Sequence, residues 1–322
     1  MGCELELEFL PGPEDLVGKI GFGTWGLGGD AYGNITKEKS IELVRYAYRN
    51  GIRVFDTSPL YGNGKCEEVL GEALSIYPRD SYKLISKAGL YKIGEVEIRN
   101  FQDSFLLESF KQSLTRLQIS FIDYFLLHSP TNSELTPGRD TRFGLQELIR
   151  GNQIKNFGVS MKAPEDLWFV NELLDVGVVE LNFSLMDQRF YRSINSRDSK
   201  YFTIARTPYN FGFLTDSPPP SSPPISPNHH LSNWQQSQFD NWHSFRGIWK
   251  SIADTNNLSI QDFALIFILS EPKIDLVIPG FMEFDHIDQA INAAKRGKLM
   301  PICMNQIKEV YSREEPRFRM VK

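Results

Sequence analysis

The sequence has few cysteines, no long apolar run and no excess of basic residues. Its three cysteines, Cys3, Cys66 and Cys303, lie far apart and form no Cys-x-x-Cys pair, which argues against a disulfide framework and against a zinc site. The longest apolar run covers residues 263–269, far fewer than the ~18 that a membrane-spanning helix needs. Lys and Arg total 35 against 40 Asp and Glu, so we expect no nucleic-acid partner.

What the sequence does contain is the composition of an ordinary globular protein. Hydrophobic residues make up 41% of the 322 residues and charged residues 23%, and the net charge is −5. The N-terminal residues are acidic and lack the basic flank and apolar stretch of a signal peptide, so we expect a cytoplasmic protein without a membrane partner. The sequence favours neither a monomer nor an oligomer. Eighteen prolines are present, and six of them fall between Pro218 and Pro227.

Short apolar runs alternate with longer amphipathic segments along most of the chain. The predicted strands are residues 19–22, 53–57, 82–86, 122–127, 154–159, 178–183, 202–205 and 275–278. The predicted helices are residues 37–49, 67–74, 104–117, 142–150, 164–175, 242–256 and 283–294. Most strand candidates lack polar alternation, as expected of parallel strands that are buried on both faces. Eight such strands in sequence predict an α/β fold, the single-domain (β/α)8 TIM barrel.

A doubly wound sheet is the competing architecture. It would need a Gly-x-Gly-x-x-Gly turn that opens the first helix, and the glycines of residues 21–29 do not lead into one. We therefore assign residues 19–300 to the barrel, residues 1–18 to an arm or hairpin that could plug its bottom, and residues 301–322 to a C-terminal tail. Residues 215–240 form a long Pro-rich loop after the seventh strand, which is typical of a functional lid or a linker.

Ionisable residues stand at or just after the carboxyl ends of three neighbouring predicted strands. Asp56 ends the second strand and Tyr61 follows it, Lys87 ends the third strand, and His128 ends the fourth. Active sites of barrels lie at this end of the strands. A Lys ammonium stabilises a nearby phenolate, an Asp holds the Lys in place, and a His can orient a substrate oxygen. Such a group suits the protonation of an oxygen during carbonyl reduction.

Each of these residues also has a common structural interpretation. A single Asp at a strand end is often a cap or turn residue, a single Lys is often an ion-pair partner, and a single His is often a core residue. The four types in this order at consecutive strand ends favour the functional interpretation.

The motifs of the chain resemble those of the aldo-keto reductases over nearly its whole length. The matching segments are GFGTWGLGG, FDTSPLYGNGKCEEVLGEAL, ISKAG, IDYFLLHSP, IKNFGVS and IPGF. The DTSP form is similar to branches that act on sugars, including aldose and galactose dehydrogenases. The resemblance implies a catalytic tetrad in which Tyr61 is the general acid, Lys87 and Asp56 support it electrostatically, and His128 orients the substrate. It also implies direct hydride transfer from NAD(P)H without a metal.

The resemblance implies a set of cofactor contacts as well. They are Gly23, Thr24, Asp56, Ser160, Glu180, Arg206, Pro208, Gly212 and Leu214. Three positions depart from the family pattern: Met161 replaces an Asn, Glu180 a Gln, and Arg206 a stacking Tyr. Residues 207–215 resemble the loop over the pyrophosphate, in which Gly212 allows close backbone approach.

The segment after IPGF departs most from the family pattern. Where relatives that prefer NADPH carry a Lys, a Ser or Thr and an Arg, this chain has Met282, Glu283 and His286, and Ala290 replaces an Asn. A carboxylate repels a 2′-phosphate but can accept hydrogen bonds from a ribose hydroxyl, so we expect a preference for NADH. Alternatively, Glu283 only caps the last predicted helix and faces water.

Trp25, Tyr32 and Trp234 are candidates for the substrate pocket, because Trp25 follows the first strand and Trp234 lies in the long loop. His229, His230 and His243 lack the Cys or carboxylate partners of a metal site, so we predict no metal. The expected substrate is a small-molecule aldehyde, ketone or sugar. The alternative function is a catalytically silent barrel that serves as a binding or regulatory subunit, an idea motivated by the departures from the cofactor pattern.

Overall fold

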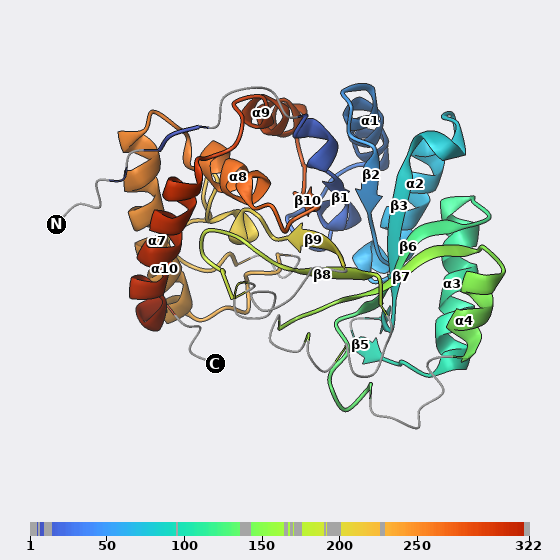
Figure 1. The fold of residues 1–322 in the computed structure, drawn as a ribbon. Coiled ribbons are helices and arrows are strands. Elements are labelled where there is room, and N and C mark those ends of the chain that lie inside the picture. Colours follow the sequence, from blue (N-terminus) through green and yellow to red (C-terminus); the bar gives the residue numbers. More distant parts are fainter. Residues whose placement is uncertain are drawn as a thin grey trace.

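The computed structural model describes residues 5, 7–9, 15–94, 96–135, 143–163, 167, 170, 176–189, 191, 201–225 and 229–318. Eight parallel strands form one sheet around a central axis (Figure 1). In sheet order they are β1 (Phe22–Gly23), β2 (Val54–Asp56), β3 (Lys83–Ala88), β6 (Ile122–His128), β7 (Ile154–Ser160), β8 (Val178–Asn182), β9 (Phe202–Arg206) and β10 (Leu276–Ile278). Two backbone hydrogen bonds of 2.8 Å, Gly21 N to Val277 O and Gly23 N to Pro279 O, join the first strand region to the last. The predicted (β/α)8 barrel is confirmed.

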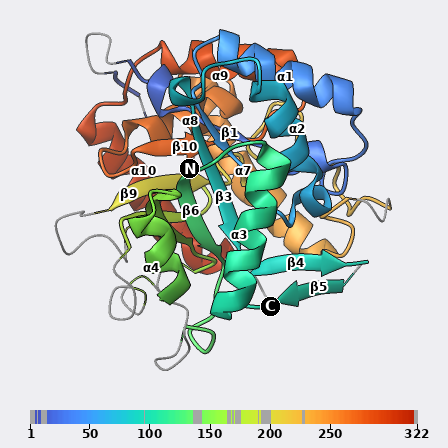
Figure 2. The same cartoon turned by 90° about the vertical axis from the view of Figure 1, so that its right-hand side faces the viewer.

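Helices surround the sheet on the outside (Figures 1 and 2). They are α1 (Lys37–Arg49), α2 (Lys65–Leu74), α3 (Asp103–Leu117), α4 (Phe143–Arg150), α7 (Gln236–Thr255), α8 (Ile260–Ser270), α9 (Phe284–Ala294) and α10 (Pro301–Phe318). Capping hydroxyls fix two of the starts: Thr36 Oγ1 accepts from Lys39 N at α1, and Ser259 Oγ accepts from Asp262 N at α8. None of the described helices is long and apolar enough to cross a bilayer.

Helices α8 and α10 and one β-hairpin of the structure were not predicted from the sequence. Helix α8 is buried on every side, so it lacks the polar stripe that marks a surface helix. The antiparallel hairpin of β4 (Leu90–Ile93) and β5 (Val96–Arg99) follows β3 directly and stands apart from the barrel (Figure 2). Its strands are four residues each.

The segment assigned to the C-terminal tail, residues 301–322, contains α10. Some predicted boundaries of helices and strands are wrong: α7 begins at Gln236 rather than at residue 242. The first strand is Phe22–Gly23, because Val17–Lys19 form a short 3-10 turn ahead of it. The helix predicted for residues 164–175 lies mostly outside the described residues. Within this range the structure describes only Leu167 and Val170, and both are helical.

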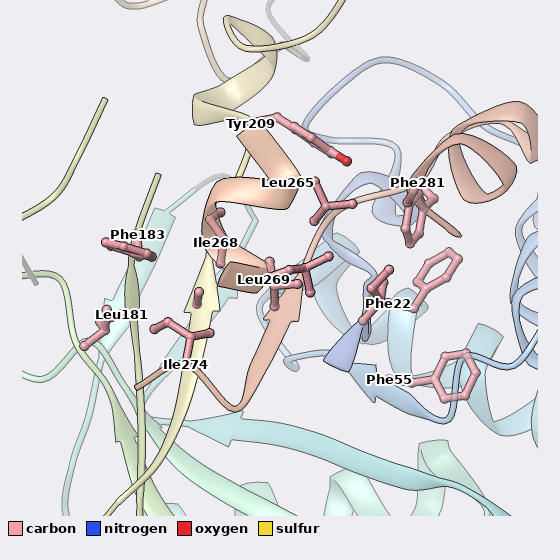
Figure 3. Close-up of a cluster of buried hydrophobic side chains, with 14 of the residues drawn as sticks. Phe22, Phe55, Leu181, Phe183, Tyr209, Leu265, Ile268, Leu269, Ile274 and Phe281 are labelled. Atoms are coloured by element: carbon pink, nitrogen blue, oxygen red, sulfur yellow. The ribbon is translucent and has the colours of Figure 1, made fainter. Parts of the chain in front are cut away.

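Aliphatic side chains fill the interior of the barrel. They are Ile85, Leu126, Val178, Ile204, Leu276 and Ile278. A second apolar region lies between the sheet and the helices, where α8 contributes Leu265 and Leu269 and the strand regions contribute Phe22 and Phe55 (Figure 3). The rings of Phe22 and Phe281 meet edge to face, with centroids 5.2 Å apart. Apolar side chains therefore pack against the strands both in the interior of the barrel and between the sheet and the surrounding helices.

The described part of the N-terminal arm contacts the helices at the end of the chain. The Asn256 side chain accepts from Leu7 N at 2.6 Å and donates to Leu5 O at 2.7 Å, and Met300 N donates to Glu8 O. The rest of the predicted arm, residues 1–4, 6 and 10–14, lies outside the described residues.

Hydrogen bonds hold both ends of the Pro-rich loop, the last residues to the segment after β1 and the first residues to α7. Near its end, His230 donates from its backbone N to Ala31 O and also contacts that oxygen through Nδ1 at 2.8 Å. Tyr32 and His229 form an isolated antiparallel bridge beside it. Near its start, Arg246 of α7 donates to Thr215 O at 3.1 Å. The end of the loop is therefore hydrogen-bonded to the segment after β1. The last residues predicted for the loop, 236–240, belong to α7.

Gly158 of β7 occupies a position where no side chain fits. A Cβ atom built there would lie 2.1 Å from Val178 O of the neighbouring strand. We expect Gly158→Ala to lower the free energy of unfolding by about 1–3 kcal/mol, measured by urea denaturation, because β7 and β8 must move apart. Gly177→Ala is the matched control, since a Cβ at Gly177 meets no atom within 4 Å. Equal losses in the two variants would contradict the argument.

Candidate active site

The charged side chains predicted for the site form the layer above the aliphatic interior, at the carboxyl ends of the strands. Side chains two positions apart on a strand face the same side. Lys87 thus follows Ile85, and Glu180 follows Val178. The same alternation that fills the barrel with aliphatic groups therefore places charges at its mouth.

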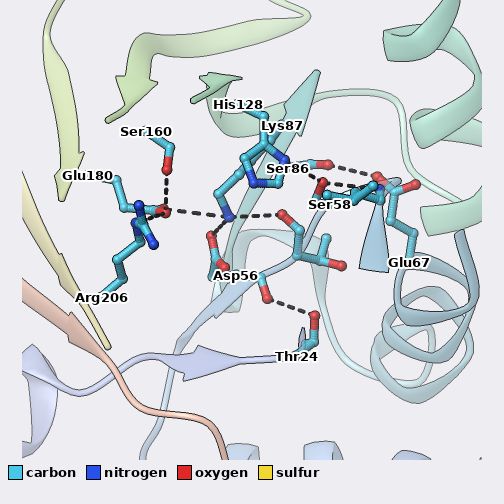
Figure 4. A network of polar contacts seen from close by, with 12 residues as sticks. Thr24, Asp56, Ser58, Glu67, Ser86, Lys87, His128, Ser160, Glu180 and Arg206 are labelled. Atoms are coloured by element: carbon cyan, nitrogen blue, oxygen red, sulfur yellow. Dashed lines mark hydrogen bonds and ion pairs between the residues drawn. The ribbon is translucent and has the colours of Figure 1, made fainter. Parts of the chain in front are cut away.

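Lys87 is fully buried and lies between two carboxylates (Figure 4). Its Nζ donates to Asp56 Oδ2 and, at 3.1 Å, to Thr57 O, and it lies 3.5 Å from Glu180 Oε2. Burial alone would lower the pKa of Lys87, but the two carboxylates outweigh it and raise that pKa above its ordinary value. Burial raises the pKa of Asp56, against the opposing effect of Lys87. The ammonium therefore keeps its proton.

Glu180 of β8 connects Lys87 to residues of the two strands beside β8, which are β7 and β9. Its Oε1 accepts from Ser160 Oγ at 2.8 Å and lies 3.8 Å from Arg206 Nε. Arg206 also donates from Nη2 to Met161 O at 2.9 Å. Among the described residues, Glu180 Oε2 and Arg206 Nε have no hydrogen-bond partner, although both atoms are buried. The pair presents an unused acceptor next to an unused donor.

Tyr61 begins a short 3-10 turn, Tyr61–Gly64, that follows β2. The turn presses against the segment after β1: a Cβ atom on Gly62 would lie 2.7 Å from Gly28 Cα, so both positions need glycine. Lys87 Nζ lies 5.2 Å from the centre of the Tyr61 ring. We expected Lys87 to lower the pKa of Tyr61. Burial instead raises that pKa above its ordinary value, and the opposing effect of Lys87 is smaller.

His128 lies beside Tyr61, with ring centroids 5.8 Å apart and the rings perpendicular. Its Nδ1 forms a 3.0 Å hydrogen bond with Ser58 Oγ, which also accepts from Leu60 N. Burial lowers the pKa of His128 well below its ordinary value, and the charges of Lys87 and the nearby arginines act in the same direction. The imidazole is therefore neutral near pH 7.

A cavity of about 530 Å³ lies over these residues. Asp56, Tyr61 and His128 line one end of it, and Asp216, Gln261 and Gln289 line another part. Its size is in the range of ordinary ligand pockets. Twelve of the residues predicted for the site line it: Gly23, Trp25, Tyr32, Asp56, Tyr61, His128, Glu180, Arg206, Pro208, Gly212, Met282 and His286.

The other predicted residues lie behind the wall or away from it. Lys87 and Ser160 do not line the cavity. Lys87 contacts Asp56 and Glu180, and Ser160 donates to Glu180, and both of these acidic residues line it. Thr24 donates from Oγ1 to Asp56 O at 2.9 Å, and Leu214 is fully buried. These residues support the ones that line the cavity.

Aromatic rings enclose the cavity above Tyr61. Trp25 lies 6.4 Å from Tyr61, 5.6 Å from Tyr32 and 6.3 Å from Phe211, measured between ring centroids. Phe211 was not singled out from the sequence, where it is one aromatic among many in a loop. Trp234, predicted for the pocket, is not among the lining residues; it packs behind Phe211 at 5.4 Å.

Gln261, Gln289 and Asp216 line the cavity and were also missed. Gln261 and Gln289 lie on α8 and α9, and Gln289 Nε2 donates to Asp216 Oδ2 at 3.1 Å and to Asp262 Oδ1 at 3.2 Å. Helical glutamines carry no local sequence signal for binding. Correct placement of α8 would have pointed to Gln261, because the residue stands in its first turn.

Glu283 does not line the cavity. Its carboxylate pairs with Lys39 of α1 at 2.5 Å, and the two side chains are 55% and 37% exposed. It is the N-cap residue of α9, but its side chain makes no capping hydrogen bond. Its negative charge is therefore partly neutralised by Lys39 and screened by water.

The residues around the cavity fit a nicotinamide. A carboxamide offers both an N–H donor and a carbonyl acceptor, and the side chains of Glu180 and Arg206, which line the cavity, carry an acceptor and a donor to match them. By contrast, no three His, Cys, Asp or Glu side chains in the described part of the chain are grouped as metal ligands would be.

Comparisons with known proteins agree with this arrangement. The family model "Aldo/keto reductase family" matches residues 19–312. The aldo-keto reductase YhdN of Bacillus subtilis is 27% identical over 268 residues, covering 81% of this chain and 80% of that protein. The NADH-specific methylglyoxal reductase of Escherichia coli is 24% identical over 282 residues, covering 82% of this chain and 86% of that protein.

Solved structures show the same fold. The glycerol dehydrogenase AKR11B4 of Gluconobacter oxydans superposes with a TM-score of 0.77 at 21% identity, covering 97% of this chain and 96% of that one. An aldo/keto reductase of Klebsiella pneumoniae in complex with NADP and acetate superposes with a TM-score of 0.66 at 20% identity, covering 91% of each chain. The family model spans nearly the whole barrel, and this chain therefore belongs to the aldo/keto reductase family.

Proposed function

We propose that this protein interconverts a carbonyl compound and an alcohol, with Tyr61 as the general acid and base. One observation carries the proposal: Asp56, Tyr61 and His128 line the same cavity, and a fully buried Lys87 lies behind them. The cofactor, when bound, supplies the hydride that reduces the carbonyl carbon. The test is a panel of aldehydes, ketones and aldoses assayed with both reduced cofactors.

Tyr61 is suited to donate a proton at neutral pH. Burial raises its pKa, so the hydroxyl is fully protonated before the reaction. As negative charge develops on the substrate oxygen, the proton moves to that oxygen, and the Lys87 ammonium stabilises the resulting phenolate. In the direction of alcohol oxidation the phenolate takes the proton back.

His128 orients the substrate in this proposal. If Ser58 donates to its Nδ1, the neutral ring carries its proton on Nε2, which can donate to the carbonyl oxygen. A neutral His does not compete with Tyr61 as the proton donor. The division of roles follows from the pKa of each group, which burial raises in Tyr61 and lowers in His128.

The cofactor is held by residues from β1, from the ends of β7 to β9 and from the segment after β10. We assign this role to Gly23, Thr24, Asp56, Ser160, Glu180, Arg206, Pro208, Gly212, Leu214, Met282 and His286. Glu180 and Arg206 would take the carboxamide, because both line the cavity together with Asp56, Tyr61 and His128. Glu283 is outside the cavity and acts, if at all, through its charge.

A preference for NADH over NADPH remains our proposal, now on different grounds. The lining residues remote from the tetrad are Met282, His286, Gln289 and Asp216, and the described lining contains no Lys, and no Arg besides Arg206. Burial lowers the pKa of His286, so it is neutral near pH 7. A 2′-phosphate would meet amides and a carboxylate there, whereas a ribose hydroxyl could donate to them.

We expect NADH to bind at least about tenfold more tightly than NADPH, equivalent to ~1.4 kcal/mol. The dissociation constants follow from quenching of protein fluorescence. His286→Arg should reduce the ratio of the two dissociation constants by strengthening NADPH binding alone, because it adds a second cation to a cavity whose described lining has only Arg206. Phe284→Arg is a control, since that side chain is exposed and does not line the cavity. Tighter binding of NADPH by the natural protein would refute the preference.

The substrate is a small carbonyl compound or a sugar in this proposal. Trp25, Tyr32 and Phe211 offer flat apolar faces, which suit either a hydrophobic group or the C–H face of a sugar. The alternative, a silent binding subunit, predicts that no substrate in the panel is turned over. Absence of binding by either cofactor at millimolar concentration would favour that alternative.

A further inference from the structure

The buried ammonium of Lys87 has three N–H groups and three oxygen neighbours. Two N–H groups are used by Asp56 Oδ2 and Thr57 O. The third oxygen is Glu180 Oε2, 3.5 Å from Nζ. A Lys ammonium has three donors and no more, so a hydroxyl that approaches Lys87 must share it with Glu180.

Glu180 is held toward Lys87 by the rest of its contacts. Ser160 Oγ donates to Oε1 at 2.8 Å, which leaves Oε2 on the side of Lys87 (Figure 4). The side chain is only 1% exposed, so water does not screen its charge. Oε2 has no hydrogen bond among the described residues, so its strongest stabilising neighbour is the Lys87 charge.

The groups that face Tyr61 and Lys87 come from every element around the mouth. They are Asp56 of β2, Lys87 of β3, His128 of β6, Glu180 of β8, Arg206 of β9 and Tyr32 of the segment after β1. His128 is neutral, and Tyr32 stays protonated because burial raises its pKa. The balance of charge is thus two carboxylates against Lys87 and Arg206.

We propose that Glu180 is a positioning residue and second counterion of Lys87, which holds the ammonium between two carboxylates and limits its support of a phenolate at Tyr61. The proposal rests on the function proposed above, and it concerns how strongly the Lys87 charge stabilises the Tyr61 phenolate. An amide at this position would keep the shape and the Ser160 contact but remove the negative charge. Glu180 therefore favours the protonated tyrosine, the form that carbonyl reduction requires.

The direction of the effect follows from the sign of the charge. Burial raises the pKa of Tyr61 and Lys87 opposes this, whereas the carboxylates of Asp56 and Glu180 add to the increase. In Glu180→Gln the pKa of Tyr61 should fall. Reduction needs protonated Tyr61, so kcat/KM for reduction should begin to fall at a lower pH in Glu180→Gln than in the natural protein. Oxidation needs the phenolate, so kcat/KM for oxidation should begin to rise at a lower pH as well.

The experiment compares Glu180→Gln with the natural protein in two ways. The first is the pH dependence of kcat/KM in both directions. The second needs no cofactor: proteins labelled with 13Cζ-tyrosine are titrated by NMR, and the Tyr61 signal is assigned by its loss in the Tyr61→Phe counterpart of each. We expect the onset of Tyr61 ionisation about one pH unit lower in Glu180→Gln, a tenfold change in the acid dissociation constant.

Two further variants separate charge from structure. Glu180→Asp keeps the charge and should retain the natural pH dependence. Ser160→Ala removes the hydrogen bond but no charge, so it should shift the onset less than Glu180→Gln. The same onset in Glu180→Gln and the natural protein would overturn the proposal, as would an equal shift in Glu180→Asp. If the natural protein turns over no substrate but the NMR shift is present, only the proposed function fails.

Discussion

Tyr61→Phe should lower kcat for carbonyl reduction by about 10²–10⁴-fold while leaving the dissociation constant of the cofactor within about twofold. The substitution removes one oxygen, the proton donor in our proposal, and general acid catalysis is worth roughly this factor. The ring remains, so its contacts with Trp25 and His128 persist. Steady-state kinetics and fluorescence titration of the reduced cofactor measure the two quantities.

Tyr32→Phe is the matched control for this prediction. Tyr32 also lines the cavity and is buried, and it contacts Trp25. Because its hydroxyl has no role as an acid in our proposal, its removal should cost less than about tenfold in kcat. If Tyr61→Phe kept more than a third of the natural kcat, another group would have to supply the proton.

Lys87→Met should be both inactive and unstable. The substitution leaves the carboxylates of Asp56 and Glu180 buried without their shared cation, which typically costs about 3–5 kcal/mol. We expect that loss in urea denaturation at pH 8. Burial already raises the folded-state pKa of Asp56, and without the opposing charge of Lys87 it rises further above its unfolded value, so the folded state binds a proton more strongly. The loss should therefore shrink as the pH falls toward 4.

The double variant Lys87→Met, Asp56→Asn separates the two effects. It removes one of the two uncompensated charges, so it should recover about half of the lost stability or more. It should recover no activity, because the ammonium that stabilises the phenolate is still absent. Recovery of turnover in the double variant would show that Lys87 acts through stability alone.

Sequence periodicity was sufficient for the barrel and for the charged layer, because both depend on local patterns. Asp56, Lys87 and His128 end apolar runs, and parallel strands bring their carboxyl ends together at one edge. Helix α8 shows where this reasoning fails. Its residues are apolar on all sides, so the pattern does not distinguish a helix from a strand, and its place was left unassigned.

The ion pairs of the site could not be predicted from the sequence either. The resemblance suggested that Glu180 contacts the cofactor, but its position 3.5 Å from Lys87 depends on how β3 and β8 face each other across the interior. The Lys39–Glu283 pair likewise joins residues 244 positions apart. Such contacts arise from tertiary packing, which no short window of sequence encodes.

The closure of the barrel has a consequence for how the protein is made. Gly21 and Gly23 bond to Val277 and Pro279, so the edge of the first strand finds its partner only when the last strand is present. The Pro-rich loop is hydrogen-bonded to the segment after β1 across 199 positions, from His230 to Ala31. Contacts between such distant residues slow folding, and a nascent chain exposes an unpaired strand edge until they form. A ribosome-bound fragment that ends before Leu276 lacks the partner of the first strand and also lacks Ile278, Met282, His286 and Gln289 of the cavity lining, so it has an unpaired strand edge and no complete cavity.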